Sequence, residues 1–318
     1  MSLLARVDDL LDRTVVGSYT NVGYALRSPR WEGVLPPLNG RTVVITGATS
    51  GLGRVAAERL AGLGAAVRLV GRSEPKLEIA RTEIVAATDN ADIETYLADL
   101  SDMAAVRKLA QALLVGEPEI HVLINNAGTL FTDRGETAEG NELTLATNLL
   151  SHFLLTNLLI PHLETSAPAR IINVSSGGMY TQRIRVHDLQ NNHGEYKGSI
   201  AYARAKRGQV ILTEIWAERL TDRGIVVHAM HPGWADTPGV EKSLPLFRKV
   251  TKPFLRTPDQ GADTIVWLAA STEAAETSSK FWLDRRARPT HRIKSTVETP
   301  ADRQGLWDAL NDLAGTNF

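Results

Sequence analysis

The sequence of 318 residues contains no cysteine. This absence excludes disulfide bonds, thiolate nucleophiles, iron–sulfur clusters and zinc sites built on cysteine. The 8 histidines do not form the His-Glu-x-x-His pattern of a zinc-binding helix, so we expect no catalytic metal. The chemistry of the protein must therefore come from oxygen and nitrogen groups.

An excess of one charge is also missing, because 35 Lys and Arg residues stand against 36 Asp and Glu residues. Such a balance argues against nucleic acid as a partner. No apolar run reaches the roughly 18 residues of a membrane-spanning helix. Asp8, Asp9 and Asp12 interrupt the apolar stretch that a secretory signal requires. We therefore expect a cytoplasmic protein without a membrane span.

What the sequence does contain is a regular alternation of short aliphatic runs and helical patterns over residues 41–285. Parallel strands joined by right-handed helical crossovers explain this pattern best. It predicts a single α/β domain, a doubly wound Rossmann-type sheet of about seven strands, with the seventh at the sheet edge. The expected strands are Thr42–Ile45, Ala66–Val70, Ile93–Leu97, Val122–Ile124, Arg170–Val174, Ile225–His228 and Phe281–Leu283.

Residues 1–40 and 286–318 flank this domain. The first part is predicted to be an amphipathic helix over residues 3–16, followed by a connector. That helix could pack on the same molecule, on a second subunit or, less favoured because its polar face has few basic residues, on a membrane surface. In the C-terminal extension, Thr299 can cap a last helix that ends before Gly315. The apolar positions of the first helix are Leu3, Leu4, Val7, Leu10, Leu11 and Val15.

A glycine-rich turn, Thr46–Gly53, directly follows the first expected strand. Glycines let the backbone pass close to a pyrophosphate, and the helix that follows supplies N–H donors at its N-terminus. The spacing is G-x-x-x-G-x-G, which predicts a dinucleotide site unless the glycines serve only a tight turn. The candidate residues are Gly47, Thr49, Ser50, Gly51, Leu52 and Gly53.

The end of the second expected strand indicates which dinucleotide is preferred. A site for NAD usually carries an acidic residue here that binds the ribose hydroxyls. This chain has Arg72 instead. A guanidinium attracts a 2′-phosphate, so the sequence favours NADP(H) over NAD(H) unless Arg72 is only a solvated surface residue.

A phenol and an ammonium lie four residues apart at Tyr202 and Lys206, on one face of an expected helix. Tyr202 is the only one of the 6 tyrosines with a lysine at this offset. The preceding strand ends in Ser175 and Ser176, at the sheet edge where doubly wound folds bind ligands. Strand alternation lets only one of these two hydroxyls face the site.

Together these motifs resemble the short-chain dehydrogenase/reductase family, and most closely its retinol dehydrogenase branch. The resemblance implies an NADP(H)-dependent oxidoreductase that interconverts a carbonyl and an alcohol on a small lipophilic substrate. The alternative is a catalytically silent sensor or scaffold that only binds NADP(H). Homo-oligomers through the helices around Asn148 and Tyr202 are common in this family. The motifs that carry the resemblance are Thr46–Gly53, Asn125–Gly128, Ser176–Met179, Tyr202, Lys206, His231–Gly239 and Gln260–Thr264.

The resemblance also assigns roles. Tyr202 becomes the general acid/base, Ser176 orients the substrate carbonyl, and Asn148 holds a water in a proton relay, unless it is an ordinary polar residue of the expected helix 142–163. Lys206 binds the cofactor ribose and is expected to help stabilise the phenolate of Tyr202, whose pKa is otherwise near 10. Choosing Ser176 over Ser175 rests on this alignment, in which the Ser–Tyr interval is about twice the usual one.

Further cofactor contacts follow from the same resemblance. Asp99 is placed near the adenine, although Asp99–Asp102 could equally be a plain helix cap. The other implied contacts are Leu100, Asn125, Asn126, Ala127, Gly128, Pro232, Gly233 and Thr237.

The segment after the sixth strand mixes apolar and basic residues near 234–256. We interpret it as a lid over the carbonyl site whose apolar residues favour a lipophilic aldehyde, ketone or alcohol. An ordinary helical hairpin is the alternative.

Overall fold

The computed structural model describes residues 3–31 and 33–318, with side chains for all of these except residues 3–7 and 15. The expected apolar face of the first helix therefore lies partly outside the described residues, at Leu3, Leu4, Val7 and Val15.

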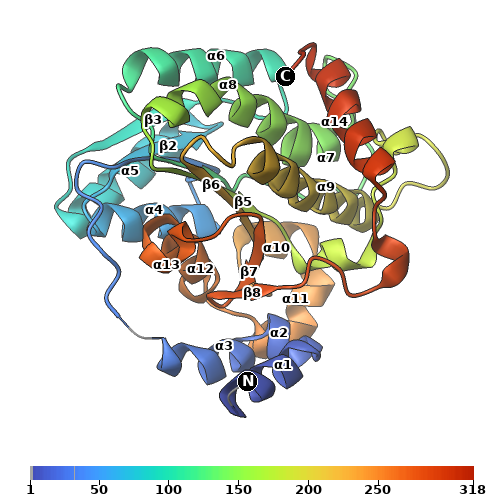
Figure 1. The fold of residues 1–318 in the computed structure, drawn as a ribbon, viewed down its shortest axis with the longest axis horizontal. Coiled ribbons are helices and arrows are strands. Elements are labelled where there is room, and N and C mark those ends of the chain that lie inside the picture. The colour runs from blue at the N-terminus through green and yellow to red at the C-terminus, as the bar shows by residue number, and fades with distance from the viewer. Residues whose placement is uncertain (1–2, 32) are drawn as a thin grey trace.

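A single eight-stranded sheet forms the centre of the molecule (Figure 1). Its strand order is β3-β2-β1-β4-β5-β6-β7-β8, and all neighbours are parallel except the antiparallel pair β7 and β8. The doubly wound Rossmann-type fold is confirmed. The strands are β1 (Thr42–Thr46), β2 (Ala66–Gly71), β3 (Ile93–Leu97), β4 (Val122–Asn125), β5 (Ala169–Val174), β6 (Ile225–Met230), β7 (Lys280–Leu283) and β8 (Arg286–Arg288).

The expected count of about seven strands is wrong by one, and β7 is not the edge strand. Asp284 and Arg285 both have positive φ, 53° and 56°. This backbone geometry belongs to the tight turns whose twist matches that of a hairpin. The chain therefore folds straight back, and Arg286–Arg288 pairs with β7. Three polar-rich residues give too weak a pattern to predict a strand.

Helices cover both faces of the sheet, because successive strand residues alternate between two apolar cores. Val44 belongs to the core under α6 (Met103–Gly116), α8 (Ser151–Thr165) and α9 (Gly198–Arg219). Val43 and Ile45 belong to the opposite core. There they pack under α4 (Gly51–Gly62), α5 (Glu74–Thr88) and α12 (Pro258–Ala270).

The expected helix 142–163 is interrupted. It consists of α7 (Leu143–Leu145), a π-helical turn η2 (Ala146–Leu150) and α8. The stretch Leu143–Thr165 is long and apolar enough to cross a membrane by length and composition, yet 78% of its most apolar window is buried inside the protein. Burial of this kind is what a core helix shows.

The C-terminal helix α14 (Pro300–Ala314) has the ends that the sequence predicts. The Thr299 side chain accepts a hydrogen bond from the backbone N–H of Asp302, and Gly315 ends the helix with a left-handed backbone. The Trp307 ring contacts Phe153 of α8 at 5.0 Å between centroids, so α14 closes one apolar core.

The N-terminal segment is not one helix over residues 3–16. It forms α1 (Leu3–Asp12), α2 (Val15–Tyr19) and α3 (Asn21–Arg27), because the Thr14 side chain accepts from the N–H of Gly17 and starts a new helix. These helices lie beside β8 and α11 at the lower end of the view in Figure 1. The remaining elements are α10 (Pro238–Ser243), α11 (Pro245–Thr251), α13 (Thr272–Ala275) and short 3-10 turns at Ser28–Arg30, Gly177–Thr181, Val186–Asp188, Lys252–Phe254 and Lys294–Thr296.

Candidate active site

The glycine turn after β1 packs so tightly that larger residues would not fit. A Cβ at Gly47, where φ is +68°, would lie 2.9 Å from the Cα of Ala127, and a Cβ at Gly53 would lie 2.4 Å from the Gly47 carbonyl oxygen. Ser50 precedes α4 and makes no side-chain cap, so the first N–H groups of this helix receive no bond from that hydroxyl. The turn is thus a cradle of backbone donors at the carboxyl end of the sheet.

The Asn125 and Asn126 side chains hold this cradle together. The Asn126 amide donates to the Thr46 carbonyl oxygen at 2.7 Å, and the Thr46 hydroxyl accepts from the N–H groups of Asn126 and Ala127, both at 3.0 Å. Asn125 is fully buried and donates to Thr156 and Asn173. Both predicted cofactor residues thus direct their side chains into the protein.

Arg72 stands beside the cradle. A Cβ at Gly71 would lie 2.9 Å from the Thr49 methyl group, which brings the end of β2 against the glycine turn. Arg72 is exposed and makes no hydrogen bond or ion pair with any other described residue. Its guanidinium is therefore available to an anion at this corner.

The turn at Asp99–Asp102 contains the helix cap that one of the two predictions describes. Asp102 caps α6 by accepting from the N–H groups of Ala104 and Ala105, as the plain-cap alternative predicts. Asp99 instead accepts from the backbone N–H of Ser101 at 2.9 Å, and its carboxylate stays exposed. Leu100 is buried between them, so Asp99 is the residue whose side chain remains available.

The predicted residues after β6 also border the cradle. The Thr237 methyl group lies 3.4 Å from the Cβ position of Gly51, so the start of α10 faces the start of α4. Gly233 has a φ of +75°, and a Cβ there would lie 2.4 Å from the Arg256 side chain, which donates to the Pro232 carbonyl oxygen at 3.3 Å. The Pro232–Gly233 turn is thus clamped by a buried arginine.

The structure separates the two neighbouring serines. The Ser176 hydroxyl lies beside the phenol of Tyr202, whose pKa it lowers, and accepts from the N–H of Gly178 at 3.2 Å. The Ser175 hydroxyl is buried and donates to the Lys206 carbonyl oxygen at 2.8 Å. Ser176 and Tyr202 therefore form a pair, whereas Ser175 fastens α9 to β5.

Lys206 lies beneath this pair, 2% exposed. Its ammonium is 5.5 Å from the centroid of the Tyr202 ring and donates to the Val174 carbonyl oxygen at 2.8 Å. No carboxylate pairs with it among the described residues. Burial lowers the pKa of Lys206 to about 7.

The pKa of Tyr202 moves opposite to the expectation. Burial raises the pKa of the phenol to about 12, and the neighbouring Ser176 hydroxyl opposes the rise only in part. Burial is the larger of these two effects. Tyr202 is therefore a protonated acid at neutral pH.

Asn148 lies in the π-helical turn, and its side chain binds the loop that follows β4. Its side chain donates to the carbonyl oxygens of Thr129 at 2.9 Å and Thr144 at 2.8 Å and accepts from the N–H of Thr129 at 3.0 Å. A Cβ at Gly128 would lie 2.8 Å from Asn148 Oδ1 and 3.1 Å from Lys206 Nζ. Asn148, Gly128 and Lys206 thus converge, with the Asn148 amide committed to backbone groups.

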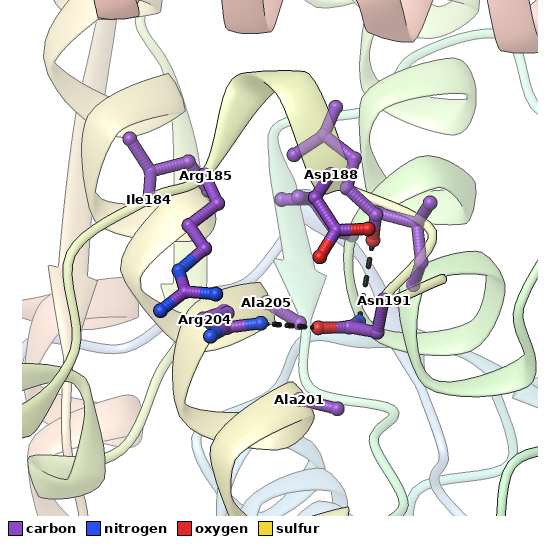
Figure 2. A pocket seen from close by; sticks show the side chains of 10 residues that line it. Ile184, Arg185, Asp188, Asn191, Ala201, Arg204 and Ala205 are labelled. Carbon is purple, nitrogen blue, oxygen red and sulfur yellow. Dashed lines mark hydrogen bonds between the residues drawn. The ribbon is translucent and has the colours of Figure 1, made fainter. Parts of the chain in front are cut away.

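The sequence interpretation missed a hollow on another face of α9. Figure 2 shows it between Ala201, Arg204 and Ala205 of α9 and the Ile184–Asn191 loop, where Arg204 donates to Asn191 at 2.7 Å. A neighbouring cavity of about 320 Å³ extends along Glu195–Lys197. Neither includes Tyr202 or Lys206. The long Ser176–Tyr202 interval was the available signal, since it supplies this loop.

No group of three or more His, Asp or Glu side chains is placed to hold a metal ion among residues 3–31 and 33–318. The polar groups that lie at this end of the sheet are hydroxyls, one lysine, one arginine and backbone N–H donors. They suit an anionic nucleotide and a polarised carbonyl.

Comparison with known proteins agrees with this geometry. A family model described as short chain dehydrogenase matches residues 41–245. Dehydrogenase/reductase SDR family member 12 from Homo sapiens is 41% identical, over 87% of this chain and 87% of that protein. Retinol dehydrogenase 12 from Bos taurus is 38% identical, over 88% of each chain. The crystal structure of an uncharacterised protein from Mycobacterium paratuberculosis is similar with a TM-score of 0.72 and 30% identity, covering 89% of this chain and 97% of that one.

Proposed function

Because this chain belongs to the short-chain dehydrogenase/reductase family of NAD(P)-binding oxidoreductases, we propose that it interconverts a carbonyl and an alcohol on a small lipophilic substrate, with NADP(H) as cofactor. The observation that carries the proposal is the Ser176 hydroxyl beside the Tyr202 phenol, with the ammonium of buried Lys206 5.5 Å from the centroid of that ring. A protein that only bound a nucleotide would have no physical need for this arrangement.

The residues present fit a dinucleotide. Gly47 and Gly53 leave a cradle that a Cβ would fill, and Ser50 leaves the α4 N-terminus open to a pyrophosphate. The Arg72 guanidinium, which has no hydrogen-bond or ion-pair partner among the described residues, supports the preference for a 2′-phosphate. Lys206 has donor capacity beyond its single bond to Val174, which suits a ribose hydroxyl. A bound nicotinamide supplies or accepts the hydride.

In the direction of reduction, the chain's own residues handle the oxygen of the substrate. Ser176 donates a hydrogen bond to the carbonyl oxygen and stabilises the negative charge that develops there. Tyr202, protonated because burial raises its pKa to about 12, gives its proton to the same oxygen. Lys206 then stabilises the phenolate that is left, since a negative charge nearby favours its protonated form.

We assign the binding of the lipophilic part of the substrate to the segment 234–256, which would act as an apolar lid. Phe247 of α11 packs edge-on against Trp234 at 5.0 Å between centroids. Leu246 and Val250 on the same helix are exposed. Apolar side chains on such a cover would enclose an alkyl or ring substituent.

The purified protein tests this proposal directly. NADPH oxidation is measured with a panel of lipophilic aldehydes and ketones, and Tyr202→Phe is expected to lower the rate at least about 100-fold while keeping NADPH affinity. Tyr96→Phe is the matched control, because that phenol binds Glu117 away from the site. Tight NADPH binding without oxidation of any panel member would instead support the sensor or scaffold.

A further inference from the structure

Tyr19 reaches the candidate active site from outside the matched family region. It ends α2 in the N-terminal segment, yet its ring packs on Gly177, the residue after Ser176. A Cβ at Gly177 would lie 1.9 Å from Tyr19 Cε1 and 2.9 Å from the Tyr19 hydroxyl oxygen. The phenol therefore takes the space that a side chain at position 177 would occupy.

Aromatic contacts fix the position of this ring. Tyr19 stacks on Trp234 with 5.6 Å between centroids and lies 5.2 Å from the His231 ring. Trp234 in turn meets Phe247 of α11. The N-terminal segment, the β6 loop and the lid helix thus form one continuous wall beside Ser176.

The segment is held in place without the phenol. The Tyr19 carbonyl oxygen accepts from the N–H of Trp234 at 2.7 Å, and Arg256 donates to the carbonyl oxygens of Ser18 and Thr20, both at 3.2 Å. Arg256 is itself paired with buried Asp284 at 2.6 Å. These bonds use backbone atoms of the segment, so removing the Tyr19 ring leaves them intact.

Ion pairs at Asp8 fasten the start of the same segment. Asp8 is bonded to Arg27, Arg286 and Arg288. Burial would raise the pKa of Asp8, but the hydrogen bonds from Arg288 and Arg27 overcome it and hold that pKa well below its ordinary value. The segment therefore stays anchored through the neutral range, and its position beside the site is part of the fold.

The Tyr19 hydroxyl makes no hydrogen bond to another described residue, and burial raises the pKa of Tyr19 to about 12. We infer that Tyr19 is a specificity-determining residue that limits the bulk of the substrate substituent nearest Ser176. The inference rests on the proposed function, because it concerns the substrate of that same site. In an apolar pocket one methylene group changes the ratio of kcat/KM values by about 10- to 200-fold.

The experiment compares decanal, whose carbonyl carries a hydrogen on one side, with octanophenone, whose carbonyl carries a bulky ring. Tyr19→Ala is expected to raise the octanophenone-to-decanal ratio of kcat/KM at least tenfold, and to tighten octanophenone binding to the NADP⁺ complex by a similar factor. Tyr19→Phe keeps the ring and should keep the wild-type ratio. Tyr24→Ala is the matched control, because that ring belongs to the same segment and lies beside Arg256 but packs on Trp31 instead of Gly177.

A double-mutant cycle tests the contact itself. Gly177→Ala should lower the melting temperature of the wild-type protein, because the new methyl group meets the Tyr19 ring, and should cost much less in the Tyr19→Ala background. Equal costs in both backgrounds, or an octanophenone affinity that Tyr19→Ala leaves unchanged, would overturn the inference. A parallel loss for both substrates would reduce Tyr19 to a structural residue.

The two proposals can fail separately. If the wild-type protein oxidises NADPH with no member of the carbonyl panel while Tyr19→Ala still tightens octanophenone binding, the proposed oxidoreductase function falls, and Tyr19 still limits the size of the ligand that binds beside Ser176. If turnover is present and the substrate ratio does not move, the role of Tyr19 falls and the function stands.

Discussion

At the scale of single residues, two adjacent hydroxyls illustrate how one backbone position decides a role. Ser175 and Ser176 have the same chemistry, but successive residues of an extended chain point to opposite sides. Ser175 therefore binds the Lys206 carbonyl oxygen inside the protein, and Ser176 meets Tyr202. The resemblance selected Ser176, which is the serine of the two whose hydroxyl lies beside the phenol.

Arg72 gives a prediction about the cofactor. Arg72→Glu should weaken NADPH binding about tenfold or more relative to NADH, because a charge-assisted hydrogen bond contributes about 1.5–3 kcal/mol and a carboxylate would repel a 2′-phosphate. Dissociation constants for both cofactors, measured by fluorescence titration, check this. Arg81→Glu is the control, since Arg81 is an exposed residue paired with Glu78. An unchanged preference would make Arg72 a plain surface residue.

Lys206 gives a prediction about pH. The folded protein releases this proton near pH 7, whereas an unfolded lysine keeps it to about pH 10.4. The unfolded chain thus binds more protons between these values, so this group makes the free energy of unfolding rise with pH by about 1 kcal/mol per unit. Urea unfolding of the wild-type protein and of Lys206→Met is measured at pH 7, 8 and 9. The free energy of unfolding of the wild-type protein, relative to that of Lys206→Met, should rise with pH. Parallel curves would contradict the buried, depressed lysine.

At the scale of elements, the residues that cap a helix predicted its bounds better than the length of an apolar pattern did. Thr299 and Gly315 bound α14 as expected, because cap residues satisfy specific free N–H and carbonyl groups. The helices expected at 3–16 and 142–163 are both interrupted. At each interruption a side chain binds a backbone group. Thr14 caps the start of α2, and Asn148 accepts from the backbone N–H of Thr129.

The cap of α14 can be tested. Thr299→Ala should lower the free energy of unfolding by about 1 kcal/mol, because the N–H of Asp302 loses its acceptor at the start of the helix. Chemical denaturation measures this, and Thr299→Ser should retain most of the stability. A loss equally large for both variants would mean that the methyl group, not the hydroxyl, stabilises this end.

At the scale of the whole molecule, α14 bears on self-association. Family resemblance leaves homo-oligomers possible through the helices around Asn148 and Tyr202. In this protein, however, Trp307 of α14 packs on Phe153 of α8, and Arg219 of α9 lies 3.7 Å above the Trp307 ring. Part of the face that two subunits would share is therefore already covered from within the chain (Figure 1).

We accordingly expect a monomer in solution. Size-exclusion chromatography with light scattering should give a mass near 34.6 kDa at micromolar concentration. A dimer that persists on dilution would show that subunits associate through another surface, or that α14 moves aside.

The sequence by itself determined the sheet, the glycine cradle and the pairing of Tyr202 with Lys206, because these depend on periodicity and on spacings within one element. It could not determine the hairpin to β8, the depth of burial that sets the Tyr202 pKa, or the interior bonds of Asn125 and Asn126. Only the tertiary structure brings Tyr19 into contact with Gly177, which lies 158 positions further along the chain. Contacts between distant segments leave no local pattern, since they arise only when the N-terminal segment and the β6 loop pack at the same edge of the sheet.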